Sequence, residues 1–269
     1  RWVADTARVK VCEKSRRIGL TWAQASSDVL LAAREGREGM DVLYISFNQE
    51  MTREYIDACA NWAKIYSKVA GEVGEFVLKD GDERSIKAFR IDFASGHKIM
   101  ALSSRPSNLR GKQGRVVIDE AAFVEDLPEL LKAALALLMW GGQVIVISTH
   151  NGAENAFNEL VQDVLSGKLP YSHHRITLDD ALSDGLYRRI CKVTRRDWTP
   201  EAEVAWRENL IMTYGDGADE ELFCIPNRSS GAYLTSAMIE ACMADGVPVI
   251  TWTPLSEDFV DWPLTATEA

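Results

Sequence analysis

Hydrophobic and polar residues follow two different periods along the first two thirds of the chain. Short alternating or wholly apolar runs predict strands, and longer stretches with apolar residues three or four positions apart predict helices. Because the two kinds of stretch alternate, the pattern indicates an α/β fold with a mainly parallel sheet. The expected strands include Val9 and Val11 and then cover residues 41–47, 85–93, 98–102, 116–118, 143–148 and 171–177, and the expected helices cover residues 21–33, 52–69, 127–139 and 155–165.

After residue 179 the pattern predicts helices without strands. Thr199 is a suitable N-cap for one of them, and the acidic stretch 215–221 is expected to form a loop. The final stretch contains prolines, tryptophans and acids without a period, which is typical of a linker. The expected helices cover residues 182–193, 200–212 and 235–244. We therefore expect three parts, which cover residues 1–178 (a core), 179–245 (a small helical subdomain) and 246–269 (a linker).

Composition and charge narrow the class of protein. The 269 residues are 46% hydrophobic and 26% charged, which is typical of a globular protein with a sizeable core. No apolar run approaches the ~20 residues that span a membrane. The net charge of −10 excludes a protein that coats nucleic acid with its whole surface, but it is compatible with a local basic groove. The five cysteines lack the spacing of a metal site and are expected to be reduced and mostly buried.

The stretch from residue 8 to residue 22 holds the first candidate site. A strand, a loop over residues 13–20 and a helix from Thr21 form the frame of a phosphate-binding loop. In the usual pattern G-x-x-x-x-G-K-[ST], Gly19 is the second glycine and Thr21 the hydroxyl residue, but Leu20 stands where lysine is usual. Lys14 can replace that lysine if its side chain reaches back over the loop. A basic turn before a surface helix is the alternative. The positive charges lie at the front of the loop, in Lys14, Arg16 and Arg17.

Two carboxylates follow the apolar strand at residues 116–118. Asp119 and Glu120 are expected at the carboxyl end of a buried strand, where open α/β sheets bind their ligands. There Asp119 would hold Mg²⁺ through water, and Glu120 would orient and deprotonate an attacking water molecule. An ordinary strand end with solvated acids is the alternative.

The next apolar strand ends in two hydroxyl residues, Ser148 and Thr149. Because this strand follows the Asp-Glu strand, the two hydroxyls are in a suitable position to sense a γ-phosphate and to report its hydrolysis. Capping of the turn by the same hydroxyls is the alternative interpretation.

Three further features receive structural interpretations. His173 and His174 are adjacent in a strand, so their side chains point to opposite faces, and no spaced acid or cysteine completes a metal site. The basic residues between positions 188 and 196 could contact DNA or a neighbouring subunit, but we favour a solvated helix face. The tryptophans at helical or turn positions are expected in the core rather than as base-stacking platforms, and they are Trp22, Trp62, Trp140 and Trp206.

These motifs, in this order, resemble those of the phage terminase large subunits, the ATPases that pack DNA into procapsids. Residues 14–21 resemble a deviant phosphate loop of the family, in which the lysine likewise stands at the front. Residues 109–111 (Leu-Arg-Gly) resemble the signature that precedes the Walker B strand, residues 116–122 resemble the Walker B motif itself, and residues 148–149 resemble the coupling motif. The Mu-like branch is the most similar, and the likeness covers about residues 2–235.

The resemblance implies a P-loop NTPase fold of the additional-strand catalytic-glutamate type, with a mainly parallel sheet flanked by helices and a small helical lid. It also implies ATP and Mg²⁺ as ligands and Glu120 as the residue that activates water. Arg110 would be an arginine finger that one subunit supplies to its neighbour, with Arg105 as the alternative. The residues implied for phosphate binding are Lys14, Ser15, Arg16, Arg17, Gly19, Thr21, Ser148 and Thr149, and those implied for Mg²⁺ are Thr21 and Asp119.

The resemblance further implies partners and a place of action. The partners would be double-stranded DNA, a portal protein, a small terminase subunit and further copies in a ring, or none when the chain is isolated as a monomer. The place would be the host cytoplasm, without a membrane. The adenine-binding glutamine and the nuclease domain of the family are not found in this sequence, so we expect an isolated motor fragment. A helicase-like or other P-loop ATPase that remodels nucleic acid, and a degenerate P-loop scaffold that does not hydrolyse ATP, are the alternatives.

Overall fold

A mainly parallel sheet forms the centre of the protein in a computed structural model that describes residues 1–66, 70–78, 86–228 and 242–243. The described strands are β1 (Val9–Lys14), β2 (Val42–Ser46), β3 (Ala70–Leu78), β4 (Ile86–Phe93), β5 (Lys98–Ser103), β6 (Arg115–Asp119), β7 (Gln143–Ser148) and β8 (Ser172–Ile176). They form one eight-stranded sheet in the order β3-β4-β5-β2-β6-β7-β1-β8. All described neighbours pair in parallel except β3 with β4 and β4 with β5, so the predicted hairpin of β4 and β5 is confirmed.

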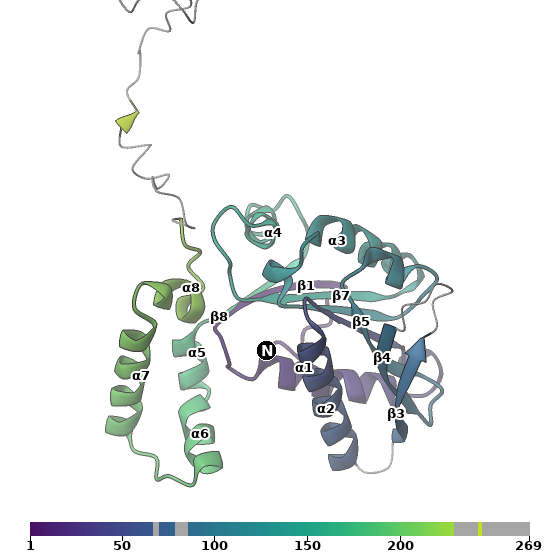
Figure 1. The fold of residues 1–269 in the computed structure, drawn as a ribbon, viewed down its shortest axis with the longest axis horizontal. Helices are drawn as coiled ribbons and strands as arrows, with labels where there is room; N and C mark the ends of the chain where they lie inside the picture. Colours follow the sequence, from purple (N-terminus) through teal and green to yellow (C-terminus); the bar gives the residue numbers. More distant parts are fainter. Residues whose placement is uncertain (67–69, 79–85, 229–241, 244–269) are drawn as a thin grey trace, which may run out of the picture. The chain divides into compact units, whose positions relative to one another are not determined.

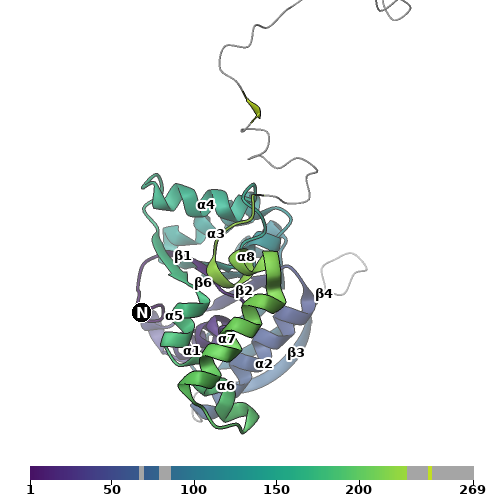
Figure 2. The ribbon, with the colours of Figure 1, turned by 90° about the vertical axis from the view of Figure 1, so that its left-hand side faces the viewer.

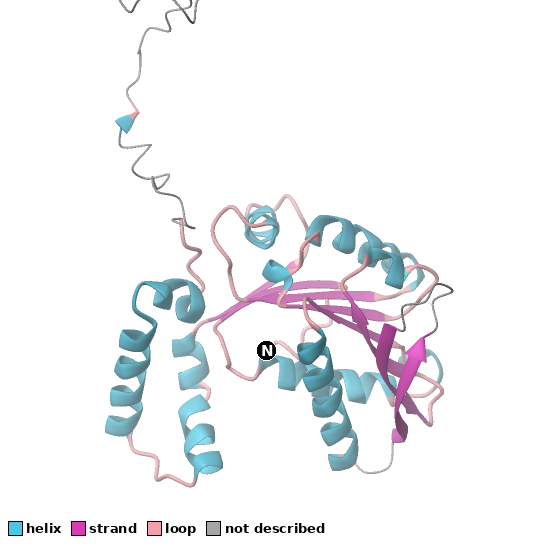
Figure 3. Ribbon diagram, viewed as in Figure 1, coloured by secondary structure: helices cyan, strands magenta, loops and turns pink. Residues whose placement is uncertain are grey.

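Helices cover both faces of this sheet (Figure 1; Figure 3). Helices α1 (Leu20–Ala32) and α2 (Gln49–Ile65) pack on one face, and α3 (Leu127–Leu135) and α4 (Ala156–Leu165) pack on the other. Successive residues of the central strands point alternately into the two hydrophobic clusters; in β6, for example, Val117 belongs to one cluster and Ile118 to the other. The predicted α/β fold with a mainly parallel sheet is therefore confirmed.

A separate group of helices follows β8 (Figure 2). It contains α5 (Leu178–Ser183), α6 (Leu186–Thr194), α7 (Pro200–Tyr214) and α8 (Ala218–Phe223). These helices have a hydrophobic cluster of their own, whose buried members are Leu178, Leu182, Tyr187, Cys191, Ala218 and Leu222. Residues Arg1–Ser230 form one compact unit that contains these helices and the sheet.

Two predictions for this helical group are wrong. The expected helix over residues 182–193 is two helices, because Gly185 adopts a left-handed conformation (φ 93°) that ends α5 and starts α6. The acidic stretch expected to be a loop forms α8 instead, in which Leu222 is buried and three acids occupy the first turn, where the helix dipole favours negative charge. The expected helix over residues 235–244 and the linker over residues 246–269 lie outside the described residues, apart from Cys242 and Met243.

Three details elsewhere were not predicted correctly. Helix α2 begins at Gln49, before the expected residue 52, because the side chain of Asn48 accepts a hydrogen bond from the amide of Met51. Strand β3 was not predicted at all. Trp140 is 80% exposed at the end of a short 3-10 turn and Trp22 is also exposed, so neither is a core residue; the other two expected core tryptophans are partly buried against hydrophobic clusters.

The cysteine prediction is confirmed for the described residues. Cys12, Cys59, Cys191 and Cys224 are free thiols and buried, while Cys242 is exposed. Burial raises the pKa of the Cys224 thiol to about 12, so this thiol stays protonated and unreactive near neutral pH. Among the described helices none is long and apolar enough to span a bilayer.

The packing of α3 on the sheet can be tested by truncating one side chain. Leu130 is fully buried in the cluster between α3 and the sheet, so we expect Leu130→Ala to reduce the free energy of unfolding by about 2–5 kcal/mol. Leu165, at the end of α4, is 57% exposed, and Leu165→Ala should change it by less than about 0.5 kcal/mol. Urea unfolding followed by circular dichroism measures both, and equal losses would contradict this arrangement of α3.

Candidate active site

The loop between β1 and α1 has the backbone of an anion site. The loop runs from Ser15 to Gly19, and Gly19 is the N-cap of α1 with φ 84°. A Cβ added at Gly19 would meet nothing within 4 Å, so glycine is required for its left-handed conformation rather than for space. No side chain caps this end of α1, which leaves the first amides of the helix available to a bound anion.

Asp119 joins this loop to the strand at the centre of the sheet. Its carboxylate is fully buried, and Oδ2 accepts hydrogen bonds from Thr21 Oγ1 at 2.7 Å and from the Tyr44 hydroxyl at 2.9 Å. Oδ1 accepts from the amide of Glu120 at 2.9 Å. Burial raises the pKa of Asp119, and the charge of Lys14 acts in the opposite direction. Thr21 and Asp119, 98 positions apart, are thus brought into direct contact.

Glu120 turns toward the loop because of its unusual backbone. Its φ of 52° lies in the left-handed region, which is uncommon for residues other than glycine and is often found at functional sites. Its Oε1 lies 2.8 Å from Nζ of Lys14, whose side chain is 5% exposed. Oε2 is buried and has no hydrogen-bond partner among the described residues. The lysine at the front of the loop therefore reaches the second acid, and one carboxylate oxygen remains able to accept a proton or a ligand.

These groups line a common cavity of about 690 Å³. Its walls include the loop, the start of α1, the ends of β2 and β6, and the first half of α2. Thr149 also lines it, whereas Ser148 is fully buried and its Oγ accepts a hydrogen bond from the amide of Ala122 at 3.0 Å. The predicted site residues among the lining side chains are Lys14, Arg16, Arg17, Gly19, Thr21, Glu120 and Thr149.

Helix α8 contacts the front of the loop through Glu221. The amide of Arg16 donates to the carbonyl of Glu221 at 2.9 Å, and Nη1 of Arg16 lies 2.7 Å from Oε1 of the same residue. Ser15 is fully buried; its amide donates to the carbonyl of Ile176, and its hydroxyl donates to the carbonyl of Glu221. The sequence indicated only an acidic stretch here, so the contact of Glu221 with the loop was missed.

The two candidate arginine fingers lie away from this cavity. Arg105 and Arg110 are exposed on the segment between β5 and β6, at the two ends of a short 3-10 helix. Neither guanidinium forms a hydrogen bond or an ion pair with any described residue, and neither lines the cavity. Both are therefore accessible to another molecule.

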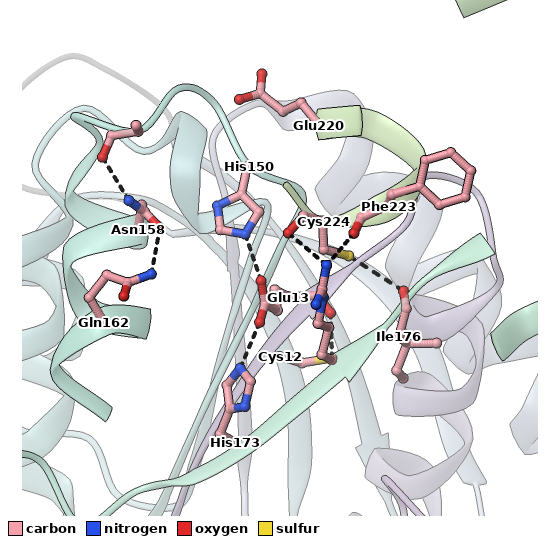
Figure 4. A network of polar contacts seen from close by, with 12 residues as sticks. Cys12, Glu13, His150, Asn158, Gln162, His173, Ile176, Glu220, Phe223 and Cys224 are labelled. Carbon is pink, nitrogen blue, oxygen red and sulfur yellow. Dashed lines mark hydrogen bonds and ion pairs between the residues drawn. The ribbon is translucent and has the colours of Figure 1, made fainter. Parts of the chain in front are cut away.

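A second network, also missed from the sequence, ties three strand ends together behind the loop (Figure 4). The carboxylate of Glu13 lies between two imidazoles, 2.8 Å from Nε2 of His150 and 2.9 Å from Nε2 of His173. His174 points the other way and contacts Asp5 at 2.7 Å. No group of three or more His, Cys, Asp or Glu side chains in the described part of the chain is arranged to hold a metal. The network connects β1, β7 and β8 and supports the structural interpretation of His173 and His174.

Comparison with known sequences finds clear relatives. The chain is 52% identical over 265 residues to the Mu-like prophage FluMu protein gp28 of Haemophilus influenzae, which covers 97% of this chain and 52% of that protein. It is 54% identical over 258 residues to the probable terminase large subunit gp28 of Escherichia phage Mu, with coverages of 93% and 47%. The chain thus spans about half the length of the curated relatives that it matches. No family model matches the sequence.

Comparison with solved structures shows the fold. The large terminase ATPase domain of Thermus phage P74-26 matches 83% of this chain and 90% of its own with a TM-score of 0.51 and 19% identity. The large terminase of a second thermophilic bacteriophage, in complex with ADP, matches 83% of this chain and 49% of its own with a TM-score of 0.54 and 17% identity. The fold is therefore that of large terminase ATPase domains, as expected from the motifs.

The contact between Arg16 and Glu221 predicts a competition between Glu221 and a bound anion. Glu221→Gln removes the carboxylate that neutralises Arg16, so we expect tripolyphosphate to bind about two- to fivefold more tightly, as measured by isothermal titration calorimetry. Glu220→Gln is the matched control, because Glu220 accepts instead from the amides of Gly152 and Asn227. If both variants bind the anion like the wild type, Glu221 does not compete with it.

Proposed function

This chain is a homologue of the Mu-like phage terminase large subunits, and we propose that it is the ATPase motor of such a subunit. In this role it hydrolyses ATP to translocate double-stranded DNA into a procapsid. The observation that carries the proposal is the meeting of Lys14, Thr21, Asp119 and Glu120 around one cavity, although the loop and the acids are about a hundred residues apart in sequence. The ADP complex of the thermophilic bacteriophage large terminase supports a nucleotide as the ligand.

The phosphates of ATP would bind at the loop. The free amides at the start of α1 and the side chains of Lys14, Arg16 and Arg17 supply hydrogen bonds and positive charge. Ser15 contributes to the shape of the loop, because its amide and hydroxyl are already bonded to β8 and α8. Thr149 lines the opposite wall, where its hydroxyl can contact the last phosphate.

The side chains next to the loop fit a magnesium ion. Mg²⁺ prefers oxygen ligands and in nucleotide sites uses one or two protein oxygens together with phosphate oxygens. Thr21 and Asp119 supply such oxygens within hydrogen-bond distance of each other. When bound, Mg²⁺ would neutralise part of the charge on the phosphates.

The contact between Lys14 and Glu120 gives a simple order of events. Without a ligand, Lys14 is neutralised by Glu120 at 2.8 Å. A phosphate at the loop competes for Lys14 and releases the carboxylate of Glu120. The released carboxylate can then accept a proton from the water molecule that attacks the γ-phosphate. Glu120 thus becomes a base only when the substrate is present.

The other parts of the assembly belong to the same proposal. Residues 1–178 form the ATPase core and residues 179–245 form the lid, supported by the separate hydrophobic cluster of α5 to α8. The exposed Arg110, which pairs with no described residue, supports a ring of subunits in which this arginine reaches a neighbouring cavity. A portal protein and a small terminase subunit complete the set of partners.

Removal of the base tests the reaction directly. We expect Glu120→Gln to reduce the rate of ATP hydrolysis by about 10²–10⁴-fold, because the attacking water loses its proton acceptor, while calorimetry shows ATP binding retained. Glu125→Gln, at an exposed acid nearby, is the control and should leave the rate unchanged. Full turnover by the Glu120 variant would refute its role as base. A wild-type chain that binds ATP without hydrolysing it would be a degenerate scaffold instead.

The finger makes a prediction about mixed assemblies. We expect Arg110→Ala to reduce DNA-dependent ATP hydrolysis by about 10³–10⁵-fold and Arg105→Ala to have a small effect. Mixing Arg110→Ala subunits with Glu120→Gln subunits should restore part of the activity, because each supplies what the other lacks. The rate is measured against the mixing ratio. A large loss with Arg105→Ala and none with Arg110→Ala would reverse the assignment, and the absence of rescue at every ratio would exclude a finger supplied between subunits.

A further inference from the structure

Tyr44 contacts the candidate metal site although no sequence motif includes it. It lies in β2, which pairs in parallel with β6, the strand that ends in Asp119. The tyrosine is 1% exposed, and its hydroxyl donates to Oδ2 of Asp119 at 2.9 Å. This is the oxygen that also accepts from Thr21. Tyr44 therefore bonds the atom that links the phosphate loop to the central strand.

The ring of Tyr44 is held in place from the other side. It stacks on Tyr55 of α2, with ring centroids 3.6 Å apart and planes 7° apart. The hydroxyl of Tyr55 donates to Oδ2 of Asp28 at 2.6 Å, and Oδ1 of Asp28 pairs with Arg115 at 2.7 Å. Because every group in this chain of contacts is buried or nearly so, the Tyr44 hydroxyl cannot turn away from Asp119 without breaking the stack.

The protonation state of Tyr44 suits a permanent donor. Burial, and next the negative charge of Asp119, raise the pKa of Tyr44 well above that of a free tyrosine. The hydroxyl therefore keeps its proton at neutral pH. A carboxylate held only by Thr21 and the amide of Glu120 would lose its contact with β2, the strand beside it in the sheet.

We propose that Tyr44 is a positioning residue for the magnesium site, where its hydroxyl fixes the orientation of the Asp119 carboxylate. The inference rests on the proposed function, because the site acts only if the cavity binds Mg²⁺ with ATP. Groups that orient a metal ligand from behind commonly change metal affinity by about 10–100-fold when they are removed. A purely structural tyrosine would instead affect folding and leave the metal dependence of nucleotide binding unchanged.

The experiment compares two matched variants of the full chain. Tyr44→Phe and Tyr55→Phe each keep the stacked ring and remove one hydroxyl, but only the first hydroxyl bonds Asp119. The affinity for a fluorescent ATP analogue is measured in EDTA and across a Mg²⁺ titration. For Tyr44→Phe we expect unchanged affinity in EDTA and a roughly 10- to 100-fold higher Mg²⁺ concentration for the half-maximal effect. Tyr55→Phe should match the wild type in both.

Each other outcome overturns the inference in a recognisable way. A wild-type chain that fails to bind the analogue refutes the proposed function and the metal role of Tyr44 with it. A wild type that responds to Mg²⁺, together with a Tyr44→Phe variant that responds equally, refutes only the role of Tyr44. An equal loss in both variants would assign the effect to packing of the stack. A Tyr44→Phe variant that unfolds at the assay temperature while Tyr55→Phe remains folded would make the hydroxyl structural.

Discussion

The burial of one carboxylate is the constraint on which the site depends. Asp119 is completely removed from solvent, and an ionised carboxylate in that position is stable only with good hydrogen-bond partners. The partners come from three different elements: Thr21 at the start of α1, Tyr44 in β2 and the amide of Glu120 beyond the end of β6. The sheet, the first helix and the candidate site are therefore stabilised by the same bonds.

Parallel strands explain why distant residues meet here. Strands β2, β6, β7 and β1 are consecutive neighbours in the sheet and run in one direction, with β2 and β6, β6 and β7, and β7 and β1 paired in parallel, so their carboxyl ends lie along one edge. Lys14 lies at the end of β1, Asp119 at the end of β6, and Thr149 directly after β7. Each strand contributes one or two polar groups, and no single stretch of sequence contains the site.

The charges of the loop are balanced within the protein when no ligand is bound. Lys14 pairs with Glu120, and Arg16 pairs with Glu221, so two of the cations at the loop already contact carboxylates. Such pairing is readily available in a chain with a net charge of −10, in which acids are abundant. A phosphate ligand would replace both carboxylates, which connects ligand binding to the base on one side and to helix α8 on the other.

The sequence by itself determined the features that local chemistry controls. Hydrophobic periodicity predicted the central strands, and Gly19 and Asp119 were found because a left-handed turn and an acid after an apolar run are local signals. Only the tertiary structure revealed Tyr44 and Glu221, because a tyrosine in a buried strand looks like any core residue and an acid in an acidic stretch looks solvated. The break at Gly185 was missed for a related reason: helical periodicity continues across it. Partners of buried polar groups are chosen by the packing of distant elements, which a single sequence does not display.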